Sequence, residues 1–130
     1  FRESTDVILV DGFDGLQIVD ALTTEEFFED CKRALTEDGV FVTNWWSGDK
    51  RYHQFVERLL GVFEGRVVEL PALTHGNMAV MAFKSTPTPT TWDALEKRAD
   101  ELEGRYGLEF CEFVRRLKEN NLHSQNRLLL

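Results

Sequence analysis

The sequence predicts an α/β fold in which a mixed sheet is followed by two helices. Two short aliphatic runs, 6–11 and 39–44, have the composition of strands buried in a parallel sheet, and an amphipathic segment lies between them. The runs 66–70 and 77–83 are joined by a loop too short for a crossover helix, which indicates an antiparallel hairpin. After residue 90, apolar residues recur three and four positions apart, as in amphipathic helices.

The first strand is expected at Asp6 to Asp11, buried on both faces because its interior is entirely apolar. It ends at the Asp11-Gly12 pair, and a loop is expected to continue from there to Leu22. The preceding residues, 1–5, are expected to be the end of a helix that leads into this strand.

The first helix is expected to begin at a capping box formed by Thr23 and Glu26 and to end at Gly39. Its apolar face is formed by Phe27, Phe28, Cys31, Ala34 and Leu35. The strand that follows, 39–44, is expected to be parallel to the first, because strand, helix and strand in succession form a right-handed crossover.

The second helix is expected after the loop 45–48, with Ser47 or Asp49 as its cap and with Gly61 and Gly65 marking its end. Its apolar face is formed by Tyr52, Phe55, Val56, Leu59, Leu60 and Phe63. The antiparallel hairpin follows this helix directly.

A Thr/Pro linker, 85–90, divides the chain into two predicted parts, namely a partial transferase-like sheet domain at 1–85 and the linker with C-terminal helices at 86–130. The first of these helices is expected at Trp92 to Tyr106, where Gly107 ends it. A final helix then carries the apolar residues Phe110, Phe113, Val114 and Leu117.

The charge of the chain argues against some partners. With 15 basic and 23 acidic residues the formal net charge is -8, so nucleic acids and anionic membranes would be repelled. A cationic ligand fits this charge, although solubility alone can account for it. No apolar run approaches the ~20 residues needed to cross a bilayer, and a cytoplasmic location is expected.

The cysteines and histidines give no metal site or disulfide framework. Cys31 and Cys111 are far apart and lie among helix-spaced apolar residues, so both are expected to be buried thiols. His53, His75 and His123 have no acidic or cysteine partner at ligand spacing, which favours surface or packing roles. No metal is therefore expected.

A resemblance to a known family rests on residues 6–14, Asp-Val-Ile-Leu-Val-Asp-Gly-Phe-Asp, and 22–35, Leu-Thr-Thr-Glu-Glu-Phe-Phe-Glu-Asp-Cys-Lys-Arg-Ala-Leu. These segments resemble the spermidine and spermine synthases, the polyamine aminopropyltransferases, over residues 1 to about 84. The resemblance is most specific at Asp11-x-x-Asp14, between a strand and a helix. It implies the C-terminal half of a class I methyltransferase-like, Rossmann-type sheet.

The resemblance implies that Asp11 is the general base, that it also contributes to the cofactor pocket, and that Asp14 holds a cationic amine. An alkylammonium group must lose a proton before its nitrogen attacks the carbon beside a sulfonium, and a carboxylate at the end of a strand can hold the amine and accept that proton. Asn44 ends the neighbouring strand and is a further candidate substrate ligand. The implied cofactor is decarboxylated S-adenosylmethionine or S-adenosylmethionine itself.

The sequence also departs from the family pattern. Residues 15–20 replace the usual Pro and Gly-Pro-Ala segment, and the hairpin loop 71–77 lacks the aromatic wall for a diamine, so the resemblance does not extend to putrescine as the acceptor. Trp45, Trp46 or Phe13 could supply apolar surface instead. The Gly-rich turn and the acidic residue that hold a nucleoside are not found, so this chain is expected to bind no cofactor tightly and to be inactive by itself.

Two alternatives to aminopropyl transfer remain. The first is an S-adenosylmethionine-dependent methyltransferase of the same fold, acting on another acceptor. The second is a non-catalytic fragment that dimerises. A homodimer is expected in either case, because the first strand would present an apolar, unpaired edge.

Overall fold

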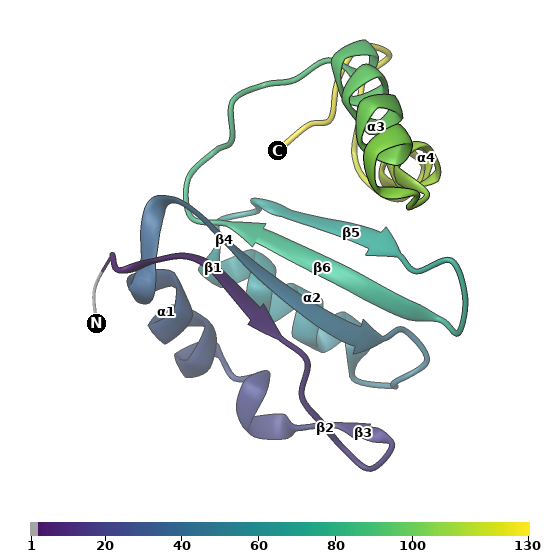
Figure 1. Ribbon diagram of the computed structural model, residues 1–130. Helices are drawn as coiled ribbons and strands as arrows, with labels where there is room; N and C mark the ends of the chain where they lie inside the picture. The colour runs from purple at the N-terminus through teal and green to yellow at the C-terminus, as the bar shows by residue number, and fades with distance from the viewer. Residues whose placement is uncertain (1–2) are drawn as a thin grey trace.

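The structure, a computed structural model that describes residues 3–130, confirms the α/β fold (Figure 1). A four-stranded sheet has the order β1-β4-β6-β5. Its strands are β1 (Thr5–Val10), β4 (Leu35–Trp46), β6 (Asn77–Phe83) and β5 (Val67–Pro71). β1 and β4 are parallel, whereas β6 is antiparallel to both β4 and β5. The predicted crossover and hairpin are thus both present.

Two helices cover one face of this sheet (Figure 1). They are α1 (Glu25–Ala34) and α2 (Tyr52–Val62). Alternate residues of β4, such as Phe41 and Trp45, point toward these helices and are buried against Phe28 of α1 and Phe55 of α2. The main hydrophobic core therefore lies between the sheet and these two helices.

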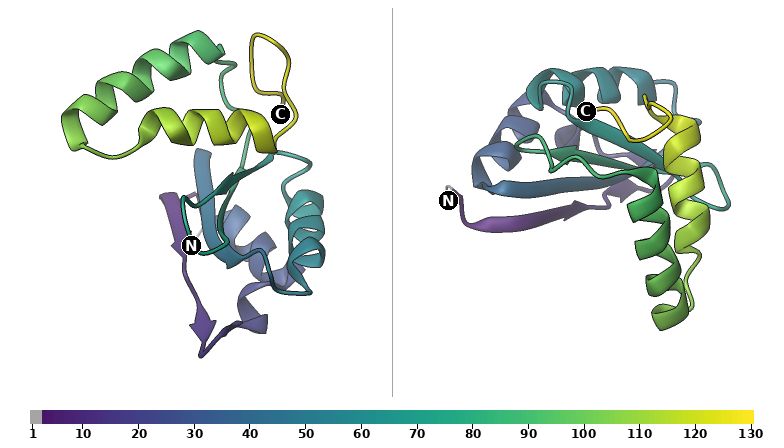
Figure 2. Two further views of the ribbon diagram at one scale, coloured as in Figure 1. Left: turned by 90° about the vertical axis from the view of Figure 1, so that its right-hand side faces the viewer. Right: turned by 90° about the horizontal axis from the view of Figure 1, so that it is seen from above.

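The C-terminal helices form a hairpin that projects from the β5 side of the sheet (Figure 2). They are α3 (Trp92–Tyr106) and α4 (Phe110–Asn120), as predicted, and Gly107 ends α3 in the left-handed conformation. Trp92, Ala99 and Val114 form a second, smaller buried cluster between them. The division into parts 1–85 and 86–130 stays a prediction.

Strand β1 is not buried on both faces, contrary to the prediction. Ile8 and Val10 pack against the main core, but Val7 is 49% exposed and Leu9 is 75% exposed. These two side chains point to the face that α1 and α2 do not cover, and β1 is an edge strand. The apolar composition of β1 therefore does not show that this chain buries the strand on both faces.

The start and end of α1 also differ from the prediction. Thr24, not Thr23, is the N-cap and accepts the Phe27 N–H, whereas Thr23 donates to the carbonyl of Asp20. The helix ends at Ala34 and β4 begins directly at Leu35, so Gly39 lies inside a strand. A Cβ at this position would come within 2.9 Å of Leu35 and of the Thr36 carbonyl, so close packing, not helix termination, requires glycine there.

The predicted helix end before β1 is not present in residues 3–4, and residues 1–2 lie outside the described part of the chain. Ser4 instead donates its N–H to the Ala34 carbonyl at 2.9 Å. The N-cap position of α2 is occupied by Arg51, although Asp49 accepts the Arg51 N–H at 2.8 Å. Leu60, expected on the buried face of α2, is exposed.

The two cysteines differ in burial. Cys31 is buried as predicted, and this burial raises the pKa of its thiol to about 11. Cys111 is exposed, contrary to the prediction, because its apolar neighbours on α4 face α3 while the cysteine does not. Only Cys31 is thus a buried structural thiol.

Candidate active site

The carboxyl ends of β1 and β4 bring together two of the predicted site residues. Asp11 directly follows β1, and Asn44 lies near the end of β4; each is one residue beyond the last register pair of the two strands, Val10 with Thr43. The Asn44 side-chain amide donates a hydrogen bond to Asp11 Oδ1 at 3.2 Å. Because the two strands are parallel, their ends meet at one edge, where α/β sheets bind ligands. The proximity predicted from topology is present, while the roles of both residues stay predictions.

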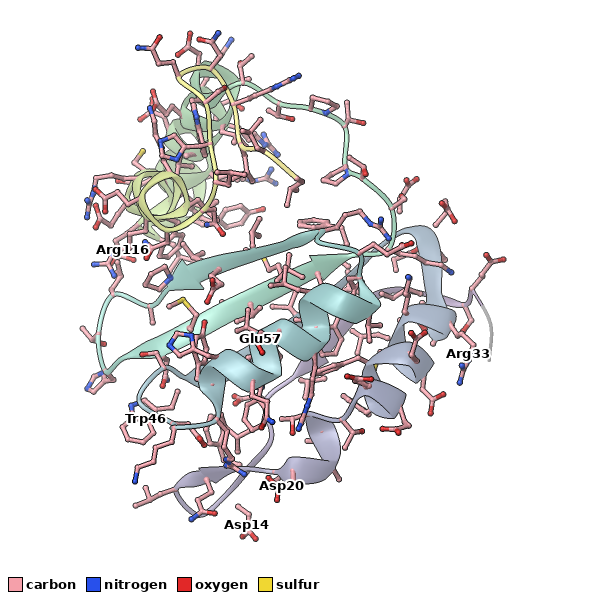
Figure 3. The ribbon with its side chains drawn as sticks, turned by 180° about the vertical axis from the view of Figure 1, so that it is seen from behind. Asp14, Asp20, Arg33, Trp46, Glu57 and Arg116 are labelled. Atoms are coloured by element: carbon pink, nitrogen blue, oxygen red, sulfur yellow. The ribbon has the colours of Figure 1, made fainter. Side chains whose placement is uncertain are left out.

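Asp14 lies in a small hairpin that the sequence did not predict. β2 (Phe13–Asp14) pairs with β3 (Gln17–Ile18), and Gly15 in the turn has a φ of 64°. Asp14 is exposed, and no hydrogen bond within residues 3–130 joins it to Asp11 or Asn44. In Figure 3 its side chain points away from the body of the protein. The hairpin therefore presents the second carboxylate on the same loop as Asp11 but separate from it.

Three charged residues beside this hairpin were not predicted as site residues. Arg51 forms a two-pronged ion pair with Asp49, with Nε to Oδ1 at 3.0 Å and Nη2 to Oδ2 at 2.8 Å. Its Nη1 also donates to Asp20, which follows the hairpin. The sequence predicted only a helix-capping role for Asp49 and no role for Arg51 or Asp20.

The charge balance of this end of the sheet is negative. The loop and the segment before α2 carry four carboxylates, Asp11, Asp14, Asp20 and Asp49, against two cations, Lys50 and Arg51. Arg51 is bonded to Asp20 and Asp49. The hydrogen bonds from Arg51 hold the pKa of the Asp49 carboxyl below its usual range. Asp11 and Asp14 stay free of any ion pair among the described residues, which suits a cationic ligand.

The three candidate aromatic residues occupy different environments. Trp45 is buried in the main core, Phe13 is exposed on the hairpin, and Trp46 is 46% exposed. Trp46 and Asn44 are two positions apart on β4 and share a face. Figure 3 shows the Trp46 ring pointing outward at the end of the sheet. Trp46 is thus the indole that lies exposed on the face of Asn44.

Two glycines leave room for the Trp46 ring. A Cβ at Gly48 would lie 2.5 Å from the indole, and one at Gly76 would lie 3.5 Å from its nitrogen. Ser47 joins the two loops, because its N–H and its hydroxyl both donate to the Gly76 carbonyl, at 2.9 and 2.7 Å. A side chain at Gly48 would displace the ring, whereas a Cβ at Gly76 would only be in van der Waals contact with it, so both loops pack closely around Trp46.

Other kinds of site are not formed by residues 3–130. No group of three or more His, Cys, Asp or Glu side chains among them could hold a metal ion. None of the helices in this part of the chain is long and apolar enough to span a membrane. A cavity of about 270 Å³ lies between the 86–90 linker and the tail, but its lining does not include Asp11, Asp14 or Asn44. His53, His75 and His123 are all exposed.

Sequence comparisons connect this geometry with known proteins. Residues 1–90 match the spermine/spermidine synthase domain family. A polyamine aminopropyltransferase of Chromobacterium violaceum is 75% identical over 130 residues, which are all of this chain and 50% of that protein. One from Neisseria meningitidis serogroup A is 64% identical over 93% of this chain and 46% of its own length. The chain thus spans about half the length of the curated relatives that it matches.

Solved structures give the same result for the fold. A probable spermidine synthase from Corynebacterium glutamicum superposes with a TM-score of 0.62 and 29% identity, over 79% of this chain and 39% of that one. A spermidine synthase in complex with the transition-state analogue AdoDATO gives a TM-score of 0.50 at 27% identity, over 67% and 32% of the two chains. The predicted methyltransferase-like sheet is confirmed.

Proposed function

Because this chain belongs to the spermine/spermidine synthase domain family, we propose that it supplies the amine-binding wall and the general base of an aminopropyltransferase. The donor is decarboxylated S-adenosylmethionine and the acceptor is a small cationic amine. The observation that carries this proposal is the hydrogen-bonded pair of Asp11 and Asn44 at the ends of two parallel strands. The relatives named as polyamine aminopropyltransferases support the reaction class.

Asp11 accepts the proton that the amine loses. The Asn44 amide occupies Asp11 Oδ1, which leaves Oδ2 to face the acceptor nitrogen. The nitrogen forms a bond to the propyl carbon, the bond from that carbon to the sulfonium sulfur breaks, and methylthioadenosine leaves with the electron pair. The sulfonium is already an activated leaving group, so the chain need only hold and deprotonate the nucleophile.

Asp14 and Trp46 bind the rest of the acceptor in this proposal. The free carboxylate of Asp14 attracts the distal ammonium group, since it has no competing ion pair among the described residues. The exposed ring of Trp46 lies on the face of Asn44 and offers apolar surface to the methylene groups. This arrangement replaces the aromatic wall that the loop 71–77 does not carry.

The nucleoside half of the site belongs to a part of the protein that this chain does not supply. The Asp11 end of the sheet is open, and β1 has no strand on its outer side within residues 3–130. The relatives are about twice as long as the segment they share with this chain. We therefore expect the chain by itself to bind the donor weakly and to be inactive.

The test is an assay of the full-length protein that contains this chain. Decarboxylated and ordinary S-adenosylmethionine are each supplied with a panel of diamines, and products are identified by mass. Aminopropyl transfer, with methylthioadenosine as the second product, is expected. Methyl transfer without aminopropyl transfer would overturn the proposal and favour the methyltransferase alternative. The chain alone serves as the control.

A further inference from the structure

We propose that Arg51 is a positioning residue that determines where Asp14 lies relative to Asp11. Arg51 is the N-cap of α2, after the second parallel strand, whereas both aspartates lie in the loop after the first. Its guanidinium group is bonded to that loop and to its own turn at once. This inference rests on the proposed function, because it gives Asp14 the task of binding the amine.

Arg51 holds the far side of the acidic loop. Its Nη1 donates to Asp20 and its Nη2 lies 3.4 Å from the carbonyl of Ile18, the last residue of the small hairpin. On the other side, Asp49 accepts hydrogen bonds from Nε and Nη2 in a two-pronged pair. The guanidinium carbon also lies 5.1 Å from the centre of the Phe55 ring. A lysine could not make these contacts together, because it has a single charged nitrogen without a planar fork.

The hairpin has few other attachments near Asp14. Ile18 is buried in the main core, and Val19 donates its N–H to the Gly12 carbonyl at 3.2 Å. By contrast, Leu16 at the tip is almost fully exposed, and Asp14 is also exposed. The position of Asp14 therefore depends on how the returning strand β3 is fixed. The burial of Ile18 fixes its end, and Arg51 adds contacts at the Ile18 carbonyl and at Asp20, which follows the strand.

Asp11 is held by a different set of contacts. It follows β1 directly and accepts a hydrogen bond from Asn44, and neither contact involves Arg51. Loss of Arg51 should therefore move Asp14 but leave Asp11 in place. In kinetic terms, binding of the amine weakens while proton removal is retained.

The experiment compares Arg51→Gln with Arg98→Gln in the full-length protein. Arg98 lies on α3 in an exposed ion pair with Glu101, so its substitution removes the same charge away from the loop. We expect Arg51→Gln to raise KM for the amine by about 10-fold, to leave KM for the sulfonium donor within about two-fold and to change kcat by less than about three-fold. Arg98→Gln should change none of these constants. An unchanged amine KM in Arg51→Gln overturns the proposal.

A second variant covers the case in which Arg51→Gln does not fold. Asp20→Asn breaks only the loop side of the contact, and Asp20 is so exposed that folding should not depend on it. It should raise the amine KM in the same direction, by about three-fold. Equal amine KM values for Asp20→Asn and wild type would contradict the proposal.

A readout without activity separates this inference from the proposed function. Limited digestion with chymotrypsin cuts after Phe13 and Leu16, both in the small hairpin. We expect the native Arg51→Gln variant to be cut there about 10-fold faster than Arg98→Gln and wild type, because the hairpin is released. If the wild type transfers no aminopropyl group, the proposed function fails, and equal cleavage rates would then show that Arg51 does not hold the loop either.

Discussion

The two edges of the sheet differ in whether another segment of the chain covers them. At the β5 edge the side chain of Asn121 donates to the Glu69 carbonyl and accepts the Glu69 N–H, each at 2.8 Å, so it pairs with the strand as a neighbouring residue would. Arg116 of α4 adds a hydrogen bond to the Ala72 carbonyl at 2.6 Å. At the β1 edge no described strand follows, and Leu9 and Val7 are exposed. The sheet is finished at one edge and open at the other (Figure 1).

We expect the β5 edge to contribute to the stability of the fold and the β1 edge to carry the candidate site. The C-terminal hairpin closes the β5 edge and carries no candidate site residue. The open β1 edge ends at Asp11, beside Asn44 and the acidic loop. In Figure 3, Arg116 lies near the helical hairpin, whereas Asp14 and Asp20 lie at the opposite end of the molecule. Substitutions at the two edges should therefore change different measurable properties.

The largest effect is expected at the end of the open edge. Asp11→Asn keeps the shape of the side chain but removes the proposed base, so kcat of the full-length protein should fall by roughly 10²- to 10⁴-fold. The free energy of unfolding should change little, since Asp11 is exposed. Steady-state kinetics measures kcat, and urea denaturation measures the free energy of unfolding. A variant that keeps full activity would remove Asp11 as the base.

The open edge itself can be tested with Leu9→Lys. If β1 is covered in the full-length protein, burial of an unpaired charge there should cost on the order of 2–4 kcal/mol of stability. In the chain alone Leu9 is exposed, so its stability should change by less than about 0.5 kcal/mol. Equal stability losses in both forms would contradict an edge that is covered only in the longer protein.

The same substitution tests the proposed homodimer of the chain alone. We expect wild type to sediment as a dimer at tens of micromolar through pairing of β1 edges, and Leu9→Lys to sediment as a monomer, because edge lysines oppose strand pairing. A monomeric wild type would count against the dimer.

At the closed edge, Asn121→Ala should reduce stability without a change in activity. It leaves the backbone N–H and carbonyl of Glu69 without their partner, which should cost about 1–3 kcal/mol. Asn120→Ala is the matched control, because the Asn120 amide donates only to the nearby Arg116 carbonyl. Chemical denaturation measures both variants. Similar losses for the two would mean that Asn121 does not protect the β5 edge.

The smallest expected effect is on the free energy of unfolding at low pH. The pKa of Asp49 is lower in the folded protein than in the unfolded chain, so its pair with Arg51 contributes stability above the unfolded value of about 3.9. That contribution should be lost as the pH falls from about 4 through the lower folded value. The difference in unfolding free energy between wild type and Asp49→Asn should thus shrink below pH 4, and a constant difference would exclude this linkage.

Apart from the small β2–β3 hairpin, the order of strands and helices could be predicted from the sequence, because period and length differ clearly between the two kinds of element. The proximity of Asp11 and Asn44 followed from topology alone, since parallel strands end at one edge. The exposure of Leu9 could not be predicted, because an apolar strand has the same composition whether this chain or another segment covers it. The contacts of Arg51 join segments distant in sequence and leave no local pattern.

The predicted ends of α1, Thr23 and Gly39, both differ from the observed ones. Gly39 had the sequence signature of a helix stop, yet the close approach of Leu35 and the Thr36 carbonyl requires it inside β4. Thr23 and Thr24 are both suitable caps, and only the tertiary position of the loop decides that Thr24 binds the Phe27 N–H. Local signals therefore located these elements to within a few residues.

Neighbouring side chains of β4 point to opposite faces of the sheet, and this has a consequence for tryptophan fluorescence. Trp45 and Trp46 are neighbours in sequence but lie on opposite faces; Trp45 is buried in the core and Trp46 is partly exposed. Trp45 and the buried Trp92 should emit at short wavelength and report unfolding, whereas Trp46 should be open to a soluble quencher such as acrylamide. An amine that binds beside Asn44 would shield Trp46 alone. If the acceptor binds as proposed, Trp46 would report its binding, and Trp45 and Trp92 would report folding.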